Sequence, residues 1–170
     1  ITGGHCDING HGPGLFGREP GALEGIADGA DQIRQAVRTQ VKYGADVIKF
    51  CATGGVLSQG DEIGAQQYSE AEMWVIVETA RLLGRRVAAH AHGTEGIKAA
   101  VRAGVNSIEH GSLLDDEGVR LMVQHGTWLV PTLLAGEAVG GPGAERRLPA
   151  WTFAKGRRAY EGMRHAIRIA

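Results

Sequence analysis

This chain of 170 residues has little cysteine, no surplus of either charge and no long apolar run. Two cysteines, Cys6 and Cys51, are too few for a disulfide framework, and we expect both to be reduced thiols. With 18 basic against 19 acidic residues, no basic surplus favours binding to nucleic acid or an anionic membrane. No apolar run approaches the roughly 18 residues that a membrane span needs. We therefore expect no nucleic-acid or membrane partner and, since no signal peptide is visible, a cytoplasmic protein.

Glycine is abundant instead, with 27 residues of 170 against a usual share of about 7%. There is no G-X-Y period, which excludes collagen. The glycines fall between segments with apolar periodicity, where they predict tight turns and loops. Gly44, Gly84, Gly104 and Gly126 stand at four similar joints, each between an apolar helical pattern and a short strand-like run.

Periodicity therefore predicts alternating helices and strands. Ile33, Val37 and Val41 recur at four-residue spacing, which is typical of one apolar helix face. Ser69 with Glu72 forms a capping box, and Thr94 is expected to cap the next helix. Helices are expected over residues 28–43, 69–84, 94–104, 115–126 and 151–170, strands over 45–50, 86–92, 105–110 and 127–132, and loops over 1–27, 52–67 and 135–149.

This order predicts an α/β fold with a parallel sheet. Polar residues gathered at the strand ends favour a β/α barrel over an open, doubly wound sheet. The glycines after the first strand, Gly54 and Gly55, lack the GxGxxG spacing of a dinucleotide site, which also weakens the open-sheet alternative. Trp128 and Trp151 are expected to pack in the core rather than to line a pocket.

Three of the predicted strands have a lysine or histidine at their carboxyl end. In a parallel barrel, the carboxyl ends of the strands form the catalytic face. His90 and His110 are expected to bind a divalent metal, since neutral imidazole suits zinc. His92 fits a metal ligand or a residue that contacts substrate or supports a ligand. Lys49 cannot bind metal as an ammonium group. Either it forms a carbamate with carbon dioxide, which can bridge two metals, or it pairs with a nearby carboxylate.

Three segments, VIKFCATGGVLSQGD, VAAHAHGTEGIKAAVRAGVNSIEHG and TWLVPTL, closely resemble the metal-dependent amidohydrolase superfamily. The branch they resemble is the imidazolonepropionase-related group, which includes Xaa-Pro dipeptidases. The resemblance covers residues 3–134, and the spacings of 41 residues from Lys49 to His90 and 20 from His90 to His110 are specific. It implies a (β/α)8 TIM barrel with two metals, usually zinc, bridged by carbamylated Lys49 and bound by His90 and His110. A metal-activated hydroxide would attack an amide carbonyl.

The resemblance also suggests substrate-contacting residues. Gly54 and Gly55 match a flexible substrate loop, with a plain turn as the alternative. His5 corresponds to a region where a histidine can touch substrate, with an ordinary loop histidine as the alternative.

Two features of the family are missing from the chain. A further HxH pair is absent, since His5 and His11 do not have that spacing, and so is the Asp of the last strand. Residues 1–170 are thus expected to be a central segment of about four β/α units, lacking the early strands and the last one.

The resemblance implies a hydrolase acting on a small amide or peptide, of the dipeptide or N-acyl amino acid type. One alternative is a barrel fragment that is inactive or works only with a complementing chain segment. Another is a cyclic-amide hydrolase or deaminase of the same superfamily. Whether the partner is a second copy of the chain or a complementing segment stays open.

Overall fold

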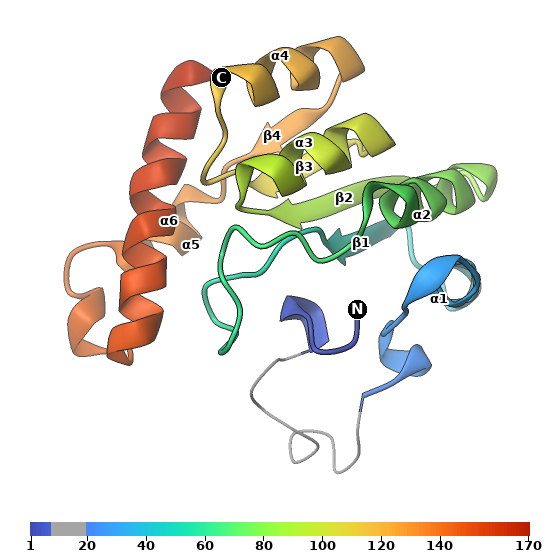
Figure 1. The fold of residues 1–170 in the computed structure, drawn as a ribbon, viewed down its shortest axis with the longest axis horizontal. Coiled ribbons are helices and arrows are strands. Elements are labelled where there is room, and N and C mark those ends of the chain that lie inside the picture. The colour runs from blue at the N-terminus through green and yellow to red at the C-terminus, as the bar shows by residue number, and fades with distance from the viewer. Residues whose placement is uncertain (8–19) are drawn as a thin grey trace.

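The computed structural model describes residues 1–7 and 20–170, and its centre is a parallel sheet of four strands in the order β1-β2-β3-β4 (Figure 1). The strands are β1 (Val47–Cys51), β2 (Arg86–Ala91), β3 (Ser107–His110) and β4 (Trp128–Val130). Neighbours in the sheet are consecutive in the chain, and all three pairs are parallel. The predicted alternation of helices and strands is confirmed.

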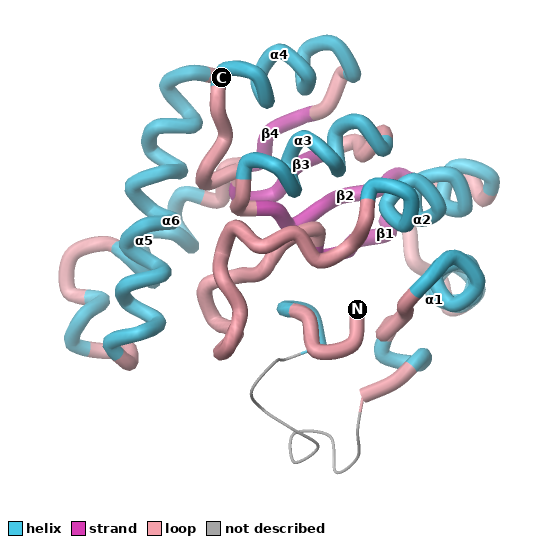
Figure 2. Tube along the Cα trace, in the orientation of Figure 1, coloured by secondary structure: helices cyan, strands magenta, loops and turns pink. Residues whose placement is uncertain are grey.

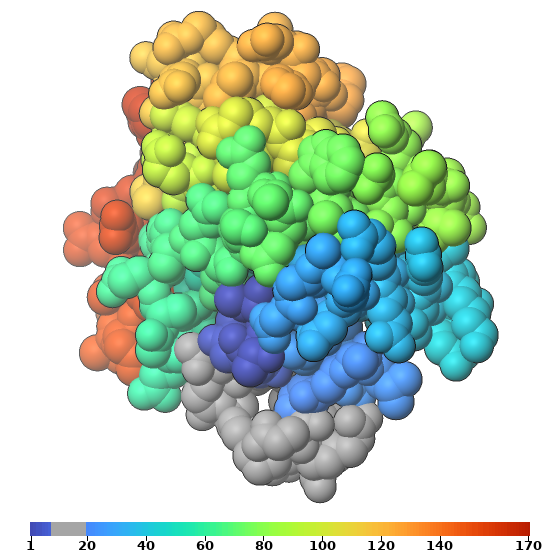
Figure 3. All heavy atoms as spheres, turned by 45° about the vertical axis from the view of Figure 1, so that its right-hand side comes forward, coloured from blue at the N-terminus to red at the C-terminus, as the bar shows by residue number. Residues whose placement is uncertain are grey.

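One face of this sheet is covered by four helices that lie side by side in chain order (Figures 2 and 3). They are α1 (Gly29–Lys42), α2 (Glu70–Leu82), α3 (Thr94–Ala103) and α4 (Asp116–His125). Alternate strand residues such as Phe50, Ala89 and Ile108 are buried against them. A doubly wound sheet has helices on both faces and a reversal of strand order. Strands in chain order under one helical layer are instead what a stretch of a β/α barrel looks like.

The remaining alternate residues of the strands point to the opposite face of the sheet. Val47 and Trp128 are 50% and 77% exposed there. The expectation that Trp128 packs in the core is wrong, because β4 is an edge strand and turns this side chain to the open face. Trp151, at the start of the last helix, is also exposed.

The helix ends follow the sequence signals in most places. Ser69 and Glu72 form the predicted capping box, and the Asp115 side chain accepts a hydrogen bond from the backbone N–H of Gly118. Gly104 and Gly126 end their helices in the left-handed conformation. Thr94 is not a cap, since Gly93 takes that position and the Thr94 hydroxyl donates to the carbonyl oxygen of Leu113.

The segment 135–149, predicted to be a loop, is largely helical. Helix α5 (Leu133–Gly140) and the short 3-10 helix η4 (Ala144–Arg146) precede α6 (Ala150–Ile169), the last helix predicted. The glycines of this segment led to the prediction of a loop, but in the structure they allow two helices to pack closely. A Cβ on Gly140 would lie 2.2 Å from the carbonyl oxygen of Gly156 in α6. Figure 1 shows α5 and α6 at the carboxyl ends of the strands.

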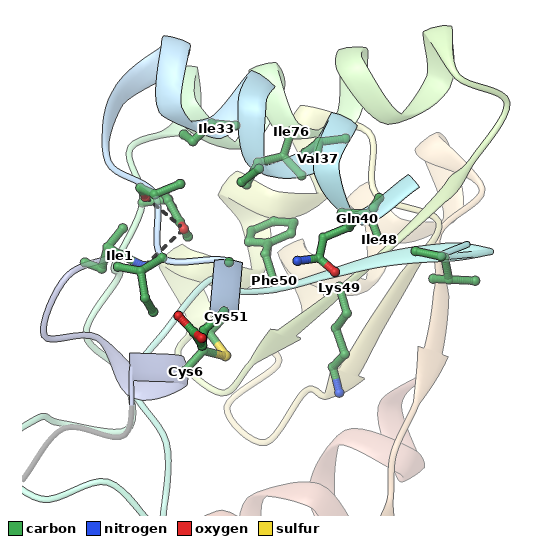
Figure 4. Close-up of a pocket in the computed structure, with 18 residues that line it drawn as sticks. Ile1, Cys6, Ile33, Val37, Gln40, Ile48, Lys49, Phe50, Cys51 and Ile76 are labelled. Atoms are coloured by element: carbon green, nitrogen blue, oxygen red, sulfur yellow. Dashed lines mark hydrogen bonds between the residues drawn. A yellow bond between two sulfur atoms is a disulfide. The ribbon is translucent and has the colours of Figure 1, made fainter. Parts of the chain in front are cut away.

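At the amino end, the described part of the predicted loop 1–27 contains two short 3-10 helices, η1 (His5–Asp7) and η3 (Ala22–Glu24). Cys6 in η1 is bonded to Cys51 in β1, with Cα atoms 6.1 Å apart (Figure 4). That separation suits a disulfide. The expectation of two reduced thiols is therefore wrong, because two cysteines 45 residues apart give no signal of pairing in the sequence. Among the described residues, no helix combines the length and apolarity needed to cross a membrane.

Candidate active site

Three histidines meet at the carboxyl ends of β2 and β3. His90 and His92 come from the end of β2, and His110 is the last residue of β3. Their candidate ligand nitrogens all lie within 4.8 Å of one another. The ring centroids are 4.7 Å apart for His90 and His92, 4.7 Å for His90 and His110, and 4.9 Å for His92 and His110. The fold thus brings together the three histidines that the sequence singled out.

His110 reaches this cluster through an unusual backbone conformation. In the register, His110 pairs with Ala91 and His90 pairs with Glu109, so regular alternation would turn His110 to the helix-covered face. Its φ of 75° is one of two positive values among described non-glycine residues. The other, 45°, belongs to Thr132, whose hydroxyl lies 2.6 Å from His110 Nδ1. Such backbone strain is typical of functional sites.

Each of the three rings has one nitrogen engaged by the protein. Ser112 Oγ lies 2.7 Å from His92 Nδ1, and Thr132 Oγ1 holds His110 Nδ1. The carbonyl oxygen of Gly54 lies 3.3 Å from His90 Nε2, which donates to it. One nitrogen of each imidazole is left for a ligand, and this is how metal-binding histidines are commonly oriented.

Burial keeps these imidazoles neutral. It lowers the pKa of His90 to about 2, with the neighbouring His92, His5 and His110 adding to the effect. The pKa of His92 falls to about 3 and that of His110 to about 4, again chiefly through burial. Neutral imidazole is the form that binds metal.

Lys49 lies on the open face of β1, the face opposite to Phe50 (Figure 4). Its side chain is exposed, and no described carboxylate forms an ion pair with it. The predicted alternative of a carboxylate partner is therefore not met within residues 1–7 and 20–170. The charge of Lys49 lowers the pKa of His5 and His110, after the larger effect of burial, so it acts on the same cluster.

His5 lies against the cluster from the amino-terminal side. Its ring stacks on that of His90 with centroids 4.5 Å apart. The backbone N–H of His5 donates to Gln67 Oε1 at 3.0 Å, and Nδ1 lies 2.7 Å from Ser58 Oγ. The structure thus places His5 at the site, whereas its contact with a substrate stays a prediction. His11 lies outside the described residues.

The loop of residues 52–67 closes over these rings, and its glycines are needed for close approach. A Cβ on Gly55 would lie 2.1 Å from a ring carbon of His5. One on Gly54 would lie 2.2 Å from the carbonyl oxygen of Glu62. A bridge between Thr53 and Gln66 ties the two ends of the loop. These positions are packed rather than a plain turn, and their contact with substrate stays a prediction.

Several residues around the site were not predicted from the sequence. Ser112 and Thr132 hold two of the histidines, and Ser58, Asp61 and Lys155 lie behind His5. Lys155 in α6 contacts Asp61 across 94 residues of sequence. Isolated serines, threonines and lysines at such separations carry no sequence signal that they share a site.

Known proteins share sequence with this chain. The model of the amidohydrolase family matches residues 5–150. The chain belongs to the amidohydrolase family. Ochratoxinase of Aspergillus niger is 46% identical over 120 residues, which is 71% of this chain and 24% of the relative.

Solved structures of amidohydrolase relatives share the fold. A Xaa-Pro dipeptidase with bound methionine has a TM-score of 0.85 at 37% identity, covering 98% of this chain and 41% of that chain. A prolidase in complex with N-methylphosphonate-L-proline has a TM-score of 0.84 at 38% identity, covering 99% and 42%. The chain thus spans about a quarter of the curated relatives it matches and about two fifths of these structures, as an incomplete barrel would.

Proposed function

We propose that the protein carrying this segment hydrolyses an amide bond in a small substrate of the dipeptide or N-acyl amino acid type. The observation that carries the proposal is the group of three neutral histidines, two buried and one half-buried, each with one nitrogen held, in a chain of the amidohydrolase family. Relatives named ochratoxinase, Xaa-Pro dipeptidase and prolidase support the substrate class.

The donor set fits a divalent metal, and zinc suits neutral imidazoles. His90, His92 and His110 would hold it, and the hydrogen bonds to Gly54, Ser112 and Thr132 keep the rings in place. When bound, such an ion polarises a carbonyl oxygen and lowers the pKa of a coordinated water. The low pKa values of the three histidines mean that protons do not compete for their lone pairs near neutral pH.

Lys49 supplies the second part of the proposed centre. Lys49 pairs in the sheet with Ala88, which lies two residues before His90 in β2, so Lys49 and His90 share one face of the sheet. The side chain of Lys49 is exposed and therefore accessible to dissolved carbon dioxide. As a carbamate it would turn from a cation into a carboxylate-like ligand for two metals. The exposed position of Lys49 and its lack of a described acidic partner support this role.

Substrate would be bound by the groups that surround the metal-holding histidines. His5 stacks on His90 and offers its imidazole at the edge of the cluster. Gly54 and Gly55 bring the backbone of the loop 52–67 close to the same rings. The remaining ligands expected for the family, an HxH pair and an Asp, would come from other parts of the protein or from a complementing chain.

The test uses the full-length protein that carries this segment. Metal analysis should find divalent metal, and a chelator should abolish hydrolysis of Xaa-Pro dipeptides or N-acyl amino acids, with recovery on adding zinc. The intact mass under native conditions should show one added carbon dioxide that is lost in Lys49→Ala. The control variant is His165→Asn, at an exposed position of α6, which should keep the metal and the activity of the wild type. Full activity in a protein that contains no divalent metal would contradict the proposal.

A further inference from the structure

A single lysine of α6 holds the loop of residues 52–67 against that helix. Lys155 Nζ donates to the carbonyl oxygens of Ser58 and Asp61 at 2.8 and 2.7 Å and to Asp61 Oδ1 at 3.0 Å. An ammonium group has three protons to donate, so these contacts use all of them. The side chains of Lys155 and Asp61 are 17% and 10% exposed, so their ion pair is largely shielded from water.

Asp61 in turn contacts the two glycines at the start of this loop. Its Oδ2 accepts the backbone N–H of Gly55 at 3.3 Å. A Cβ on Gly54 would lie 2.7 Å from the same oxygen, so the carboxylate packs directly on the Gly54 backbone. Burial alone would raise the pKa of Asp61, but hydrogen bonds from Ser58 and Lys155 outweigh it and lower the pKa. An ionised Asp61 therefore holds the backbone of both glycines.

Gly54 is the residue through which the loop contacts the histidine cluster. Its carbonyl oxygen lies 3.3 Å from Nε2 of His90. A carbonyl oxygen only accepts hydrogen bonds, so the proton of the neutral His90 ring is on Nε2 and its lone pair is on Nδ1. His90 is 5% exposed, which leaves water little access to replace this contact. The position of the Gly54 carbonyl thus fixes both the orientation of the ring and the nitrogen that is left for a metal.

We propose that Lys155 and Asp61 are positioning residues that hold the carbonyl oxygen of Gly54 on Nε2 of His90, so that α6 sets the affinity of the histidine cluster for its metal. The inference rests on the proposed function for the reaction that the metal serves, whereas the hydrogen bond and the affinity belong to the protein itself. Without Lys155, the largely buried Asp61 carboxylate would lose its cation, which favours its movement to water. Gly54 would then lose the group that packs on it, and His90 its fixed acceptor.

The first experiment measures the zinc affinity of the full-length protein by competition with a chromophoric chelator. Lys155→Met removes the ammonium group and keeps an unbranched side chain. It should lower the affinity about tenfold, as expected when a metal-binding histidine loses the partner that orients it.

The matched control is Lys98→Met. Lys98 is also a largely buried lysine that pairs with carboxylates, those of Asp115 and Glu117, but it joins α3 to α4 in the helical layer. Its loss should destabilise the fold and leave the zinc affinity unchanged. Wild-type affinity in Lys155→Met, or an equal loss of affinity in Lys98→Met, overturns the proposal.

A spectroscopic signature shows whether the effect passes through His90. In zinc-loaded, full-length protein labelled with ¹⁵N at histidine, the ring N–H of His90 is identified by its loss in His90→Asn. The proton should be on Nε2 and exchange slowly with water, and Lys155→Met should speed the exchange about tenfold, as for the loss of one hydrogen bond. His110, whose ring is held by Thr132, is the reference in the same spectrum. A proton on Nδ1 of His90 in the wild type, an unchanged exchange rate in the variant, or equally faster exchange at His110 overturns the proposal.

A double-mutant cycle tests whether Lys155 and Asp61 act together. Asp61→Asn should also lower the zinc affinity about tenfold, and Lys155→Met should add little in that background, because both residues act through Gly54. Losses that multiply would mean independent effects and would overturn the proposal.

The two proposals of this article fail in different ways. A wild type that binds zinc and hydrolyses no amide refutes the proposed function, while the affinity and exchange measurements still decide the role of Lys155. A wild type that hydrolyses amides with zinc, together with a Lys155→Met variant of unchanged affinity, refutes only the role of Lys155.

Discussion

The imidazole rings of His90 and His110 lie 4.7 Å apart, although the sheet register pairs His110 with Ala91 and not with His90. The positive φ of His110 turns its ring across the sheet, and Thr132, also at positive φ, holds it there. Both residues that set the contact between His90 and His110 thus have a strained backbone, which costs stability but holds the ring of His110 in position.

Removing the hydroxyl groups behind the histidines should weaken metal binding without removing a ligand. We expect Ser112→Ala and Thr132→Val each to lower the affinity for zinc by about 10- to 100-fold, because the rings of His92 and His110 lose the partner that orients them. Competition with a chromophoric chelator measures the change. His125→Asn, exposed at the end of α4, should leave the affinity as it is. Wild-type affinity in both hydroxyl variants would contradict this account of the site.

The metal-free protein should become less stable as the pH falls. The histidines of the unfolded chain take up protons near pH 6.5, whereas those of the folded cluster have pKa values of about 2, 3 and 4. Below pH 6.5 the unfolded state thus binds more protons, and the free energy of unfolding falls by up to about 1.4 kcal/mol per histidine and pH unit. Urea unfolding from about pH 7 to about pH 5 in chelator measures this. His110→Asn should flatten the dependence, and a slope equal to that of the wild type would count against the cluster as its source.

The close approach of Gly55 to His5 should make a single methyl group costly. A Cβ at residue 55 would lie 2.1 Å from the ring, so Gly55→Ala should displace His5 and destabilise the fold by about 1–3 kcal/mol. Gly21→Ala is the control, since Gly21 has an extended backbone and no atom within 4 Å of an added Cβ. Denaturant unfolding compares the two variants. Equal stability of both would mean that His5 does not occupy this position.

The bond between Cys6 and Cys51 should stabilise the fold and keep the His5 segment on β1. It links residues 45 apart in sequence, for which the chain-entropy model gives a stabilisation of about 4 kcal/mol. Reduction with a dithiol should therefore lower the melting temperature of the wild type. Cys6→Ser should melt at the lower temperature already and not respond to the reductant. Titration of two free thiols in the untreated protein would disprove the bond.

The sequence by itself predicted most of the helices and strands and the meeting of the histidines at the strand ends. Periods such as Ile33, Val37 and Val41, the capping box at Ser69 and the glycine stops define helices and strands because they act within a few residues. Strand ends carrying Lys49, His90 and His110 predicted a cluster because the carboxyl ends of parallel strands meet at one edge.

The tertiary structure decided what depends on distant partners. The helix α5 forms because glycines let it approach α6, and the disulfide forms because the fold brings η1 to β1. The backbone turn at His110 and the hydrogen bonds from Lys155 to His5 also arise only after folding. Contacts of this kind join residues tens of positions apart, and no local propensity or spacing encodes which of them will meet.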